Sequence, residues 1–433
     1  MNYVLSGDWH SRTVLSRGTS QSEGYYGYLW PDAEGDDKFG EYYSYVNQQN
    51  ATTGIQQNFN GDFTLGTVRN RMVVGLDFFS KQAVDNSLGE AFIRNVTPQG
   101  DIDYTDPGSG ETRPPVYMSR ASIDPLLALT EPGNSKARTS TYGAYVADVI
   151  NFWPSLAVMA GLRANYFYSD GERSDPEDGY HQFALSPKFG LVYQPVLDKV
   201  SLFANYQNGF YQVAPTSVAD PDGNNPRLKS FEPEQANQWE AGLKVNLWAG
   251  RLFATASYYD INIKNKVIGD VDNIHNSVQG GQIESKGFEV ELHARPVKGM
   301  HLIAGYSHNQ VENTKGNKGD FYSEPGRAPG GQGPADQLNF WLTYRIPQGR
   351  LKNFGAALGG NYASRYRVID NSVTGVFDLP AYVLLNGSLF YESDRFRFAL
   401  NVNNLTDETY YIGYWSVNPQ KPLNFAAGVT WKF

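Results

Sequence analysis

The sequence predicts an all-β protein, an antiparallel transmembrane β-barrel of about sixteen strands in one domain, residues 1–433. Three observations carry this prediction. Apolar and polar residues alternate with a period of two along many segments. The connections between these segments alternate between short and long. Aromatic residues make up 14% of the chain, with 29 Tyr against 24 Phe.

The alternation is clearest at the carboxyl end. Phe433, Trp431 and Val429 alternate with Lys432 and Thr430, so an apolar face opposes a small or polar face. In a strand, successive side chains point to opposite faces, which places one face in an apolar medium and the other in water. Four further segments show the same pattern: 239–247, 288–295, 338–346 and 396–403.

A soluble β-sandwich also has alternating strands, and two features count against it. The expected strands run for about 12 to 16 residues, whereas strands of globular sheets usually have about 5 or 6. A sandwich also gives no reason for the strict alternation of short and long connections.

Seven short turns and eight long loops connect the expected strands. The turns lie at 65–67, 153–154, 195–199, 249–250, 297–299, 347–352 and 393–394. The loops lie near 18–40, 83–137, 170–181, 212–234, 265–282, 313–336, 367–378 and 408–421. Short turns on one side and long loops on the other are typical of bacterial outer-membrane barrels. A closed barrel also lets strands cross a bilayer without unpaired backbone groups.

Composition excludes several classes of protein. The aromatic content excludes a disordered chain. The net charge of −9 argues against a nucleic-acid partner, because such proteins carry basic patches. The absence of Cys excludes disulfides and thiolate metal sites. No stretch approaches the ~18 apolar residues of a membrane helix, and the first residues show no signal peptide.

Six segments resemble one family when they are read in order. They are 186–193 (SPKFGLVY), 201–210 (SLFANYQNGF), 232–244 (EPEQANQWEAGLK), 285–292 (SKGFEVEL), 403–411 (NNLTDETYY) and 429–433 (VTWKF). Each is weak alone, but in this order the chain from about 140 onward resembles TonB-dependent siderophore receptors. Residues before about 135 resemble them only in pattern.

The resemblance implies energised uptake of a ferric siderophore across the outer membrane of a Gram-negative bacterium. It implies as partners the ferric siderophore, outer-membrane lipid and TonB. Receptors of this family hold a plug domain inside a barrel of about 22 strands, preceded by a TonB-binding segment. We therefore expect this chain to be the C-terminal part of such a barrel, with the plug and first strands absent and residues 2–20 as about the seventh strand. The alternative is a passive sixteen-stranded porin-like diffusion channel.

Aromatic and arginine residues near the loops are the candidate ligand-binding residues. Tyr and Trp offer rigid apolar faces with a polar tip, and Arg offers planar donors to an anionic chelate. The alternative is that these aromatics anchor the barrel at the membrane interface. The candidates are Tyr25, Tyr26, Tyr28, Trp30, Phe210, Tyr211, Arg365, Tyr366, Arg367, Tyr414 and Trp415.

Catalytic and metal-binding patterns are not apparent. The six His residues show no metal-ligand spacing, and no nucleophile motif or phosphate loop is present. Glu289 and Glu291 share a strand face, where we expect them to line a polar wall beside Arg295. The acidic runs 175–178 and 220–225 could offer oxygens to calcium, but each lacks the full loop. We expect no enzyme and no cofactor, and an outer-membrane enzyme is the third alternative.

The last strand carries a further expectation. Phe433, Trp431 and Val429 resemble the terminal signal that the outer-membrane assembly machinery reads. Such a strand must offer unpaired backbone groups for strand addition together with an apolar face. The alternative is that Phe433 is an ordinary interface aromatic.

Overall fold

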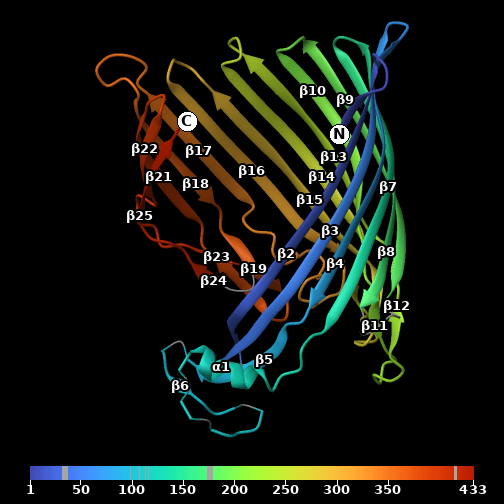
Figure 1. Ribbon diagram of the computed structural model, residues 1–433, viewed down its shortest axis with the longest axis vertical. Coiled ribbons are helices and arrows are strands. Elements are labelled where there is room, and N and C mark those ends of the chain that lie inside the picture. The colour runs from blue at the N-terminus through green and yellow to red at the C-terminus, as the bar shows by residue number, and fades with distance from the viewer. Residues whose placement is uncertain are drawn as a thin grey trace. The chain divides into compact units, whose positions relative to one another are not determined.

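The chain folds almost entirely as β-strands (Figure 1). The computed structural model describes residues 1–31, 38–97, 99–106, 108–112, 114–115, 117–172, 179–413 and 417–433. Two compact units make up the chain. Unit 1 is 1–60, 74–144 and 164–183, and unit 2 is 61–73, 145–163 and 184–433.

In the part of the chain that the structure describes, sixteen strands run between the short turns and the long loops, as the sequence predicts. They are β2 (Trp9–Pro31), β3 (Phe39–Leu65), β4 (Val68–Asp85), β7 (Ser135–Trp153), β8 (Leu156–Glu172), β9 (Tyr180–Val196), β10 (Val200–Tyr211), β13 (Glu234–Leu247), β14 (Leu252–Gly269), β15 (Ser277–Ala294), β16 (Met300–Lys315), β17 (Asp336–Arg345), β18 (Phe354–Ala363), β21 (Tyr382–Glu392), β22 (Phe396–Asn403) and β25 (Asn424–Trp431). Among the described residues they share one 19-stranded sheet with β1 (Asn2–Val4), β5 (Leu88–Val96) and β6 (Ile102–Asp103).

Neighbouring strands of unit 2 pair antiparallel, and the register keeps like residues on one face. An apolar row crosses four strands: Leu202, Leu243, Ala256 and Val290. One residue further along, a polar row crosses the same strands: Ser201, Lys244, Thr255 and Glu291. The period-two pattern in the sequence therefore corresponds to an apolar and a polar face of the sheet.

All seven predicted short turns are confirmed, each joining two consecutive long strands. Glycine occupies a position of positive φ in four of them, including Gly66 with φ 62° and Gly250 with φ 78°. The turn before β18 places Asn353 at φ 75°, in the left-handed region that Asn tolerates better than most residues.

The long connections are confirmed, and the limits predicted for the connection at 212–234 agree with the structure to within one residue. The limits predicted at 18–40 and 265–282 are wrong, because hairpin pairing continues further than expected. The connection predicted at 18–40 is mostly strand, since β2 extends to Pro31 and β3 begins at Phe39. Three loops of unit 2 contain small hairpins of their own. These are β11 (Thr216–Val218) with β12 (Arg227–Lys229), β19 (Tyr366–Asn371) with β20 (Gly375–Leu379), and β23 (Tyr411–Gly413) with β24 (Val417–Pro419).

One further expectation for unit 1 is wrong, and one of its loops contains a helix that was not predicted. Residues 2–20 are not one strand, because β1 folds back on β2 with Asn2 opposite Arg12. The loop at 83–137 contains a helix, α1 (Arg120–Leu127), which begins with a capping box between Ser119 and Ser122. No helix in the described part of the chain is long and apolar enough to cross a membrane.

Candidate functional site

A row of aromatic rings in contact lies at the loop end of unit 1. The ring centroids of Tyr26 and Tyr28 are 5.6 Å apart, and those of Tyr28 and Tyr42 are 5.7 Å apart. Phe92 on β5 continues the row, 5.5 Å from Tyr42. Trp30 shares the face of β2 with Tyr26 and Tyr28 because the three alternate along the strand. We call Tyr26, Tyr28, Tyr42 and Phe92 the aromatic row.

The aromatic row is partly accessible and fixed in place. Tyr26 is 57% exposed, and Tyr28, Tyr42 and Phe92 are half-buried. Trp30, beside the row, is 60% exposed. Tyr28 is hydrogen-bonded to Glu90 on β5, which orients its ring. Offset or edge-on rings at these separations stabilise one another, so the row offers a preformed apolar surface with polar rims.

Tyr25 does not belong to this surface. It projects from the opposite face of β2 and forms a hydrogen bond with Asp124 of α1. The Nε of Arg120 donates a 3.0 Å hydrogen bond to the Tyr25 hydroxyl. Tyr25 and Tyr45 also pack against the buried side chains of Ile123 and Leu127. These contacts dock α1 on the strands, so the structure gives Tyr25 a role in packing.

Phe210 and Tyr211 end β10, where Tyr211 lies opposite Glu234. Tyr211 is 69% exposed, whereas Phe210 is half-buried. The two side chains point to opposite faces, and Tyr211 is on the polar face with Gln207. Of this pair, Tyr211 is therefore the accessible candidate.

The segment Arg365–Arg367 lies in the loop between β18 and β21 and is tied to neighbouring residues. Arg367 Nη1 lies 2.9 Å from Asp370 Oδ2, and Arg365 Nη1 lies 3.6 Å from Asp378 Oδ2. The Tyr366 hydroxyl donates to the Gly413 carbonyl at 3.2 Å and accepts from the Gly413 N–H at 3.3 Å. Arg365 keeps most of its guanidinium free, with 73% of its side chain exposed.

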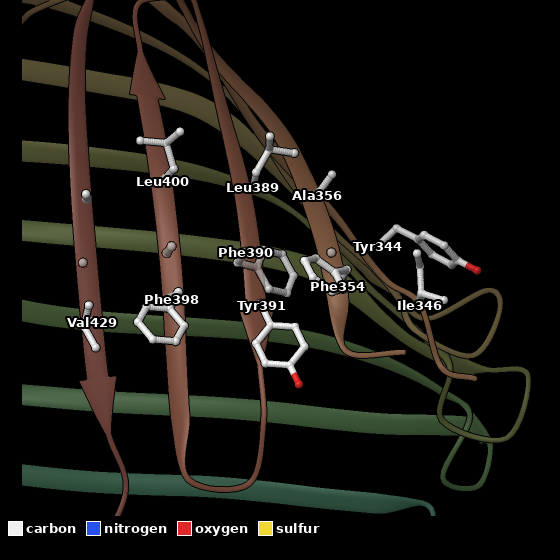
Figure 2. Close-up of a pocket in the computed structure, with 14 residues that line it drawn as sticks. Tyr344, Ile346, Phe354, Ala356, Leu389, Phe390, Tyr391, Phe398, Leu400 and Val429 are labelled. Carbon is white, nitrogen blue, oxygen red and sulfur yellow. The ribbon is translucent and has the colours of Figure 1, made fainter. Parts of the chain in front are cut away.

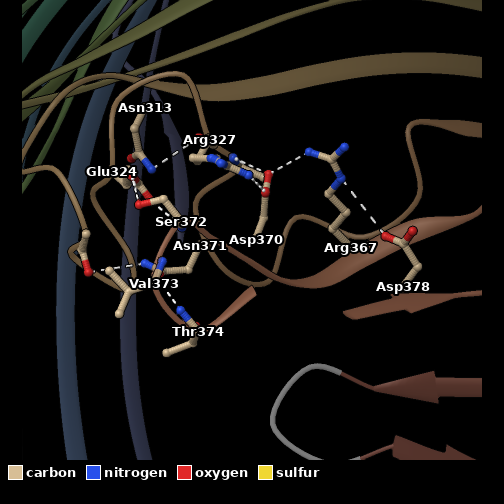
Figure 3. Close-up of polar contacts among 12 residues, drawn as sticks. Asn313, Glu324, Arg327, Arg367, Asp370, Asn371, Ser372, Val373, Thr374 and Asp378 are labelled. Carbon is tan, nitrogen blue, oxygen red and sulfur yellow. Dashed lines mark hydrogen bonds and ion pairs between the residues drawn. The ribbon is translucent and has the colours of Figure 1, made fainter. Parts of the chain in front are cut away.

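A polar network joins this loop to the loop between β16 and β17 (Figure 3). Figure 3 shows Asp370 between Arg327 and Arg367, with 2.9 Å contacts to both. The Ser372 N–H donates to Glu324 at 2.8 Å. We call Glu324, Arg327, Arg367, Asp370 and Ser372 the loop network.

The loop network shifts the pKa values of its acids. Burial of Asp370 raises its pKa, but hydrogen bonds from Arg327, the Ala328 N–H and Arg367 outweigh it, so the pKa lies below its usual range. Hydrogen bonds from the Ser372 hydroxyl and N–H hold the pKa of Glu324 low. Both acids are therefore ionised at neutral pH and bind the two loops together.

Tyr414 and Trp415 lie outside the described residues. Their neighbour Tyr410 packs on Tyr382, with ring centroids 4.8 Å apart.

The acidic candidates within the described part of the chain show no catalytic or metal-binding arrangement. Glu289 and Glu291 share the polar face of β15 and line a groove of about 700 Å³ together with Lys188 and Lys244. Asp220 accepts hydrogen bonds from Asn225 and Arg227 within its own turn. The run 175–178 falls outside the described residues. Within the described residues, no three His, Asp or Glu side chains could hold a metal ion together.

The terminal residues lie as the alternation predicts. Val429 lies opposite Phe398 and Trp431 opposite Phe396, so both are on the apolar face of β25. Val429 is 66% exposed and Trp431 is 60% exposed.

The chain from residue 2 to residue 405 matches the family model described as TonB dependent receptor-like, beta-barrel. The chain belongs to the TonB-dependent receptor family. The predicted family and fold class are thus confirmed, and the chain belongs to the outer membrane of a Gram-negative bacterium. The family consists of receptors and not of enzymes, and it does not favour the porin-like alternative.

Three curated relatives are receptors for metal chelates. The metal-pseudopaline receptor of Pseudomonas aeruginosa is 25% identical over 384 residues, covering 86% of this chain and 49% of the relative. The ferric-pyoverdine 358 receptor of Pseudomonas putida is 28% identical over 291 residues, covering 63% of this chain and 32% of the relative. The ferrioxamine B receptor of Salmonella typhimurium is 23% identical over 418 residues, covering 95% of this chain and 50% of the relative. The chain spans about half the length of the longest-matching relatives.

Solved structures share the fold. FpvA of P. aeruginosa bound to heterologous pyoverdines superposes with a TM-score of 0.77 at 20% identity, covering 100% of this chain and 55% of FpvA. The closed form of the ferric-catecholate import receptor Fiu of E. coli K12 gives a TM-score of 0.76 at 16% identity, covering 99% of this chain and 62% of Fiu.

In this family the apolar face contacts lipid, and unit 2 carries aromatic belts on it. Tyr206 and Trp239 pack with ring centroids 4.7 Å apart, five residues from the loop ends of their strands. Phe354 and Tyr391 pack at 4.8 Å beside the short turns. Trp248 lies at the turn of the same hairpin, about nine residues from Trp239. That separation corresponds to roughly 30 Å along a strand. With the usual tilt of about 40°, that length matches the ~25 Å apolar band of an outer-membrane barrel.

Several residues of the candidate surfaces were not predicted from the sequence. Tyr42 and Phe92 complete the aromatic row, and Glu324, Arg327 and Asp370 form the core of the loop network. A signal was available for Tyr42, since it lies in the aromatic cluster 42–45 beside the predicted loop. Nothing local marks Arg327 or Asp370 as partners.

Proposed function

We propose that this chain is the barrel of an outer-membrane receptor that captures a chelated metal, such as a ferric siderophore, for uptake energised through TonB. The observation that carries the proposal is the family match over residues 2–405. Support for the ligand class comes from the relatives, whose names specify metal-pseudopaline, ferric pyoverdine and ferrioxamine B. We further propose that residues 1–433 form one barrel domain, and that uptake belongs to the whole receptor of which this barrel is a part.

The aromatic row and Trp30 are the proposed ligand surface of unit 1. Exposed rings remove apolar parts of a chelate from water, while tyrosine hydroxyls hydrogen-bond its amide or catechol oxygens. In unit 2, Tyr211 and Arg365 are the proposed contacts, because each is more than two-thirds exposed at the end of a strand or in a loop. Arg365 would attract an anionic chelate. Phe210, Tyr366, Arg367, Tyr414 and Trp415 remain proposed contacts of lower priority. No cofactor is proposed, because the metal is part of the cargo.

Titration of the detergent-solubilised protein with ferric pyoverdine, ferrioxamine B and a ferric catecholate tests the proposal. Intrinsic fluorescence quenching reports binding. Tyr26→Ala and Tyr28→Ala should each raise the Kd about tenfold, since a stacked ring contributes about 1 kcal/mol beyond its buried area.

Tyr193→Ala is the matched control, because Tyr193 is 44% exposed but lies on the apolar face of β9. Its Kd should equal that of the unmodified protein. Equal Kd values for all three variants would contradict the proposed surface. In planar bilayers, a steady open-pore conductance without any chelate binding would favour a passive channel instead.

A further inference from the structure

The apolar face of unit 2 has a hollow of about 640 Å³ near the short turns. It crosses β17, β18, β21, β22 and β25 (Figure 2). Its lining is almost wholly apolar, and Tyr344 and Tyr391 bring the only side-chain hydroxyls. The figure shows Phe354, Tyr391, Phe398 and Val429 as one tier beside the turns.

Small side chains create the hollow. The next tier across the sheet reads Tyr344, Ala356, Leu389, Leu400 and Ala427. Ala356 and Ala427 stand where bulkier residues would bring the surface level with Leu389 and Leu400. The space is therefore a recess in the face that contacts lipid, walled by the aromatic rings of the first tier.

Cationic side chains stand at the turns that border this recess. Arg350 and Lys352 lie in the turn between β17 and β18, and Arg395 lies in the turn between β21 and β22. All three are exposed, and none has a side-chain partner within the described residues. The one other charged residue inside these two turns is Asp394.

The turns and the recess are continuous. Ile346 and Phe354 both line the recess and close the first turn, since the Ile346 N–H donates to the Phe354 carbonyl at 2.9 Å. The Glu392 N–H donates to the Asn353 carbonyl at 3.0 Å, which joins the two turns. Unpaired cations therefore border one end of an apolar recess.

We propose that this recess binds one phospholipid of the inner leaflet of the outer membrane, with an acyl chain in the recess and its phosphate beside Arg350, Lys352 and Arg395. Short turns of outer-membrane barrels face the periplasm, so the adjacent leaflet is the phospholipid one. A phosphate is attracted to unpaired Arg and Lys, and Arg can bind it through two donors. Tyr344 and Tyr391 suit the boundary between headgroups and acyl chains, because each has an apolar ring and a polar tip.

Native mass spectrometry of the delipidated protein, titrated with phosphatidylglycerol, tests the proposal. Ala356→Leu/Ala427→Leu fills the recess, and Arg350→Gln/Lys352→Gln/Arg395→Gln removes the cations. Each variant should raise the Kd of the tightest lipid site at least tenfold. The matched controls are Ala241→Leu and Lys199→Gln. Ala241 is an exposed alanine of the apolar face outside the recess, and Lys199 lies at another short turn. Both controls should leave the Kd of the tightest lipid site unchanged.

Heat-modifiable electrophoretic mobility establishes that each variant is folded, and titration with palmitate and with lipopolysaccharide distinguishes other occupants. Phosphatidylglycerol should bind more tightly than either. Equal Kd values in the filled variant and the unmodified protein would overturn the proposal. So would palmitate or lipopolysaccharide binding as tightly as phosphatidylglycerol, since the site would then not select an inner-leaflet phospholipid.

Discussion

Arg327 and Asp370 lie in two different long loops, and their side chains meet at 2.9 Å. The Asp370 side chain is only 4% exposed, while that of Arg327 is 33% exposed. Arg367 and the Ala328 N–H donate to the same carboxylate. One buried acid thus holds two loops that are separate in sequence, which preorganises this part of the receptor surface.

Asp370→Asn should loosen both loops. The substitution leaves Arg327 and Arg367 without their shared carboxylate, at a cost of about 1–3 kcal/mol to the local structure. Hydrogen exchange measured by mass spectrometry should accelerate in peptides from 316–335 and 364–381 and stay unchanged in β13 to β15. Asp394→Asn, at an exposed short turn, is the control and should change neither loop. Unchanged exchange in D370N would show that the loops are held by other contacts.

Acid should release the same loops. The pKa values of Asp370 and Glu324 are lowered in the folded state, so their stabilisation is fully present above the unfolded values of about 4 and is lost as the pH falls through the folded values. The chain has no Cys, so Lys318→Cys/Val376→Cys accepts one spin label on each loop. The distance distribution between the labels should be narrow at pH 7 and broaden below about pH 4.

Adding Asp370→Asn and Glu324→Gln to the labelled protein should reproduce the broad distribution at pH 7, because both substitutions remove the charge that acid neutralises. A narrow distribution in that variant would assign the acid effect to other groups.

The strands and short turns could be predicted because their signals are local. Period-two alternation and turn residues such as Gly66 and Gly250 act within a few positions of the chain. The limits of the connection at 18–40 could not be predicted, because β2 and β3 continue pairing through polar sequence that is typical of a connection. Helix α1 contains Pro125, a residue that usually argues against a helix, and its capping serines were the available signal.

The kinds of residue at the candidate site could be predicted, but the particular residues and their contacts only in part. Tyr25 and Tyr26 are adjacent in sequence, yet one docks α1 and the other belongs to the aromatic row, because neighbouring residues of a strand face opposite ways. Arg327 and Asp370 are 43 residues apart, and their contact depends on the relative placement of two loops. No pattern in one sequence encodes that placement.

Gly359→Ala should destabilise the sheet. A Cβ at this position would lie 2.0 Å from the Trp341 ring and 2.7 Å from the Phe340 carbonyl oxygen, so the backbone or the ring must move. Overpacking of this kind typically costs about 1–3 kcal/mol. The midpoint of heat-modifiable unfolding should fall. Gly428→Ala is the matched control, because nothing lies within 4 Å of its added Cβ. Equal midpoints for the two variants would mean that Trp341 relaxes freely.

Substitution of Phe433 tests whether this residue is an assembly signal or an interface aromatic. It lies two residues beyond the end of β25, whose Trp431 and Val429 are on the apolar face, and its side chain is fully exposed. As an ordinary interface residue, Phe433→Ala should lower stability by a few kcal/mol at most. As a signal for the assembly machinery, it should reduce insertion far more than Phe396→Ala, which removes a similar ring that packs 6.3 Å from Trp431. Folded, heat-modifiable barrel in isolated outer membranes measures insertion for both variants. We expect the amount of folded F433A barrel to be a small fraction of the amount of folded F396A barrel. Equal amounts of the two would mean that Phe433 is an ordinary interface residue.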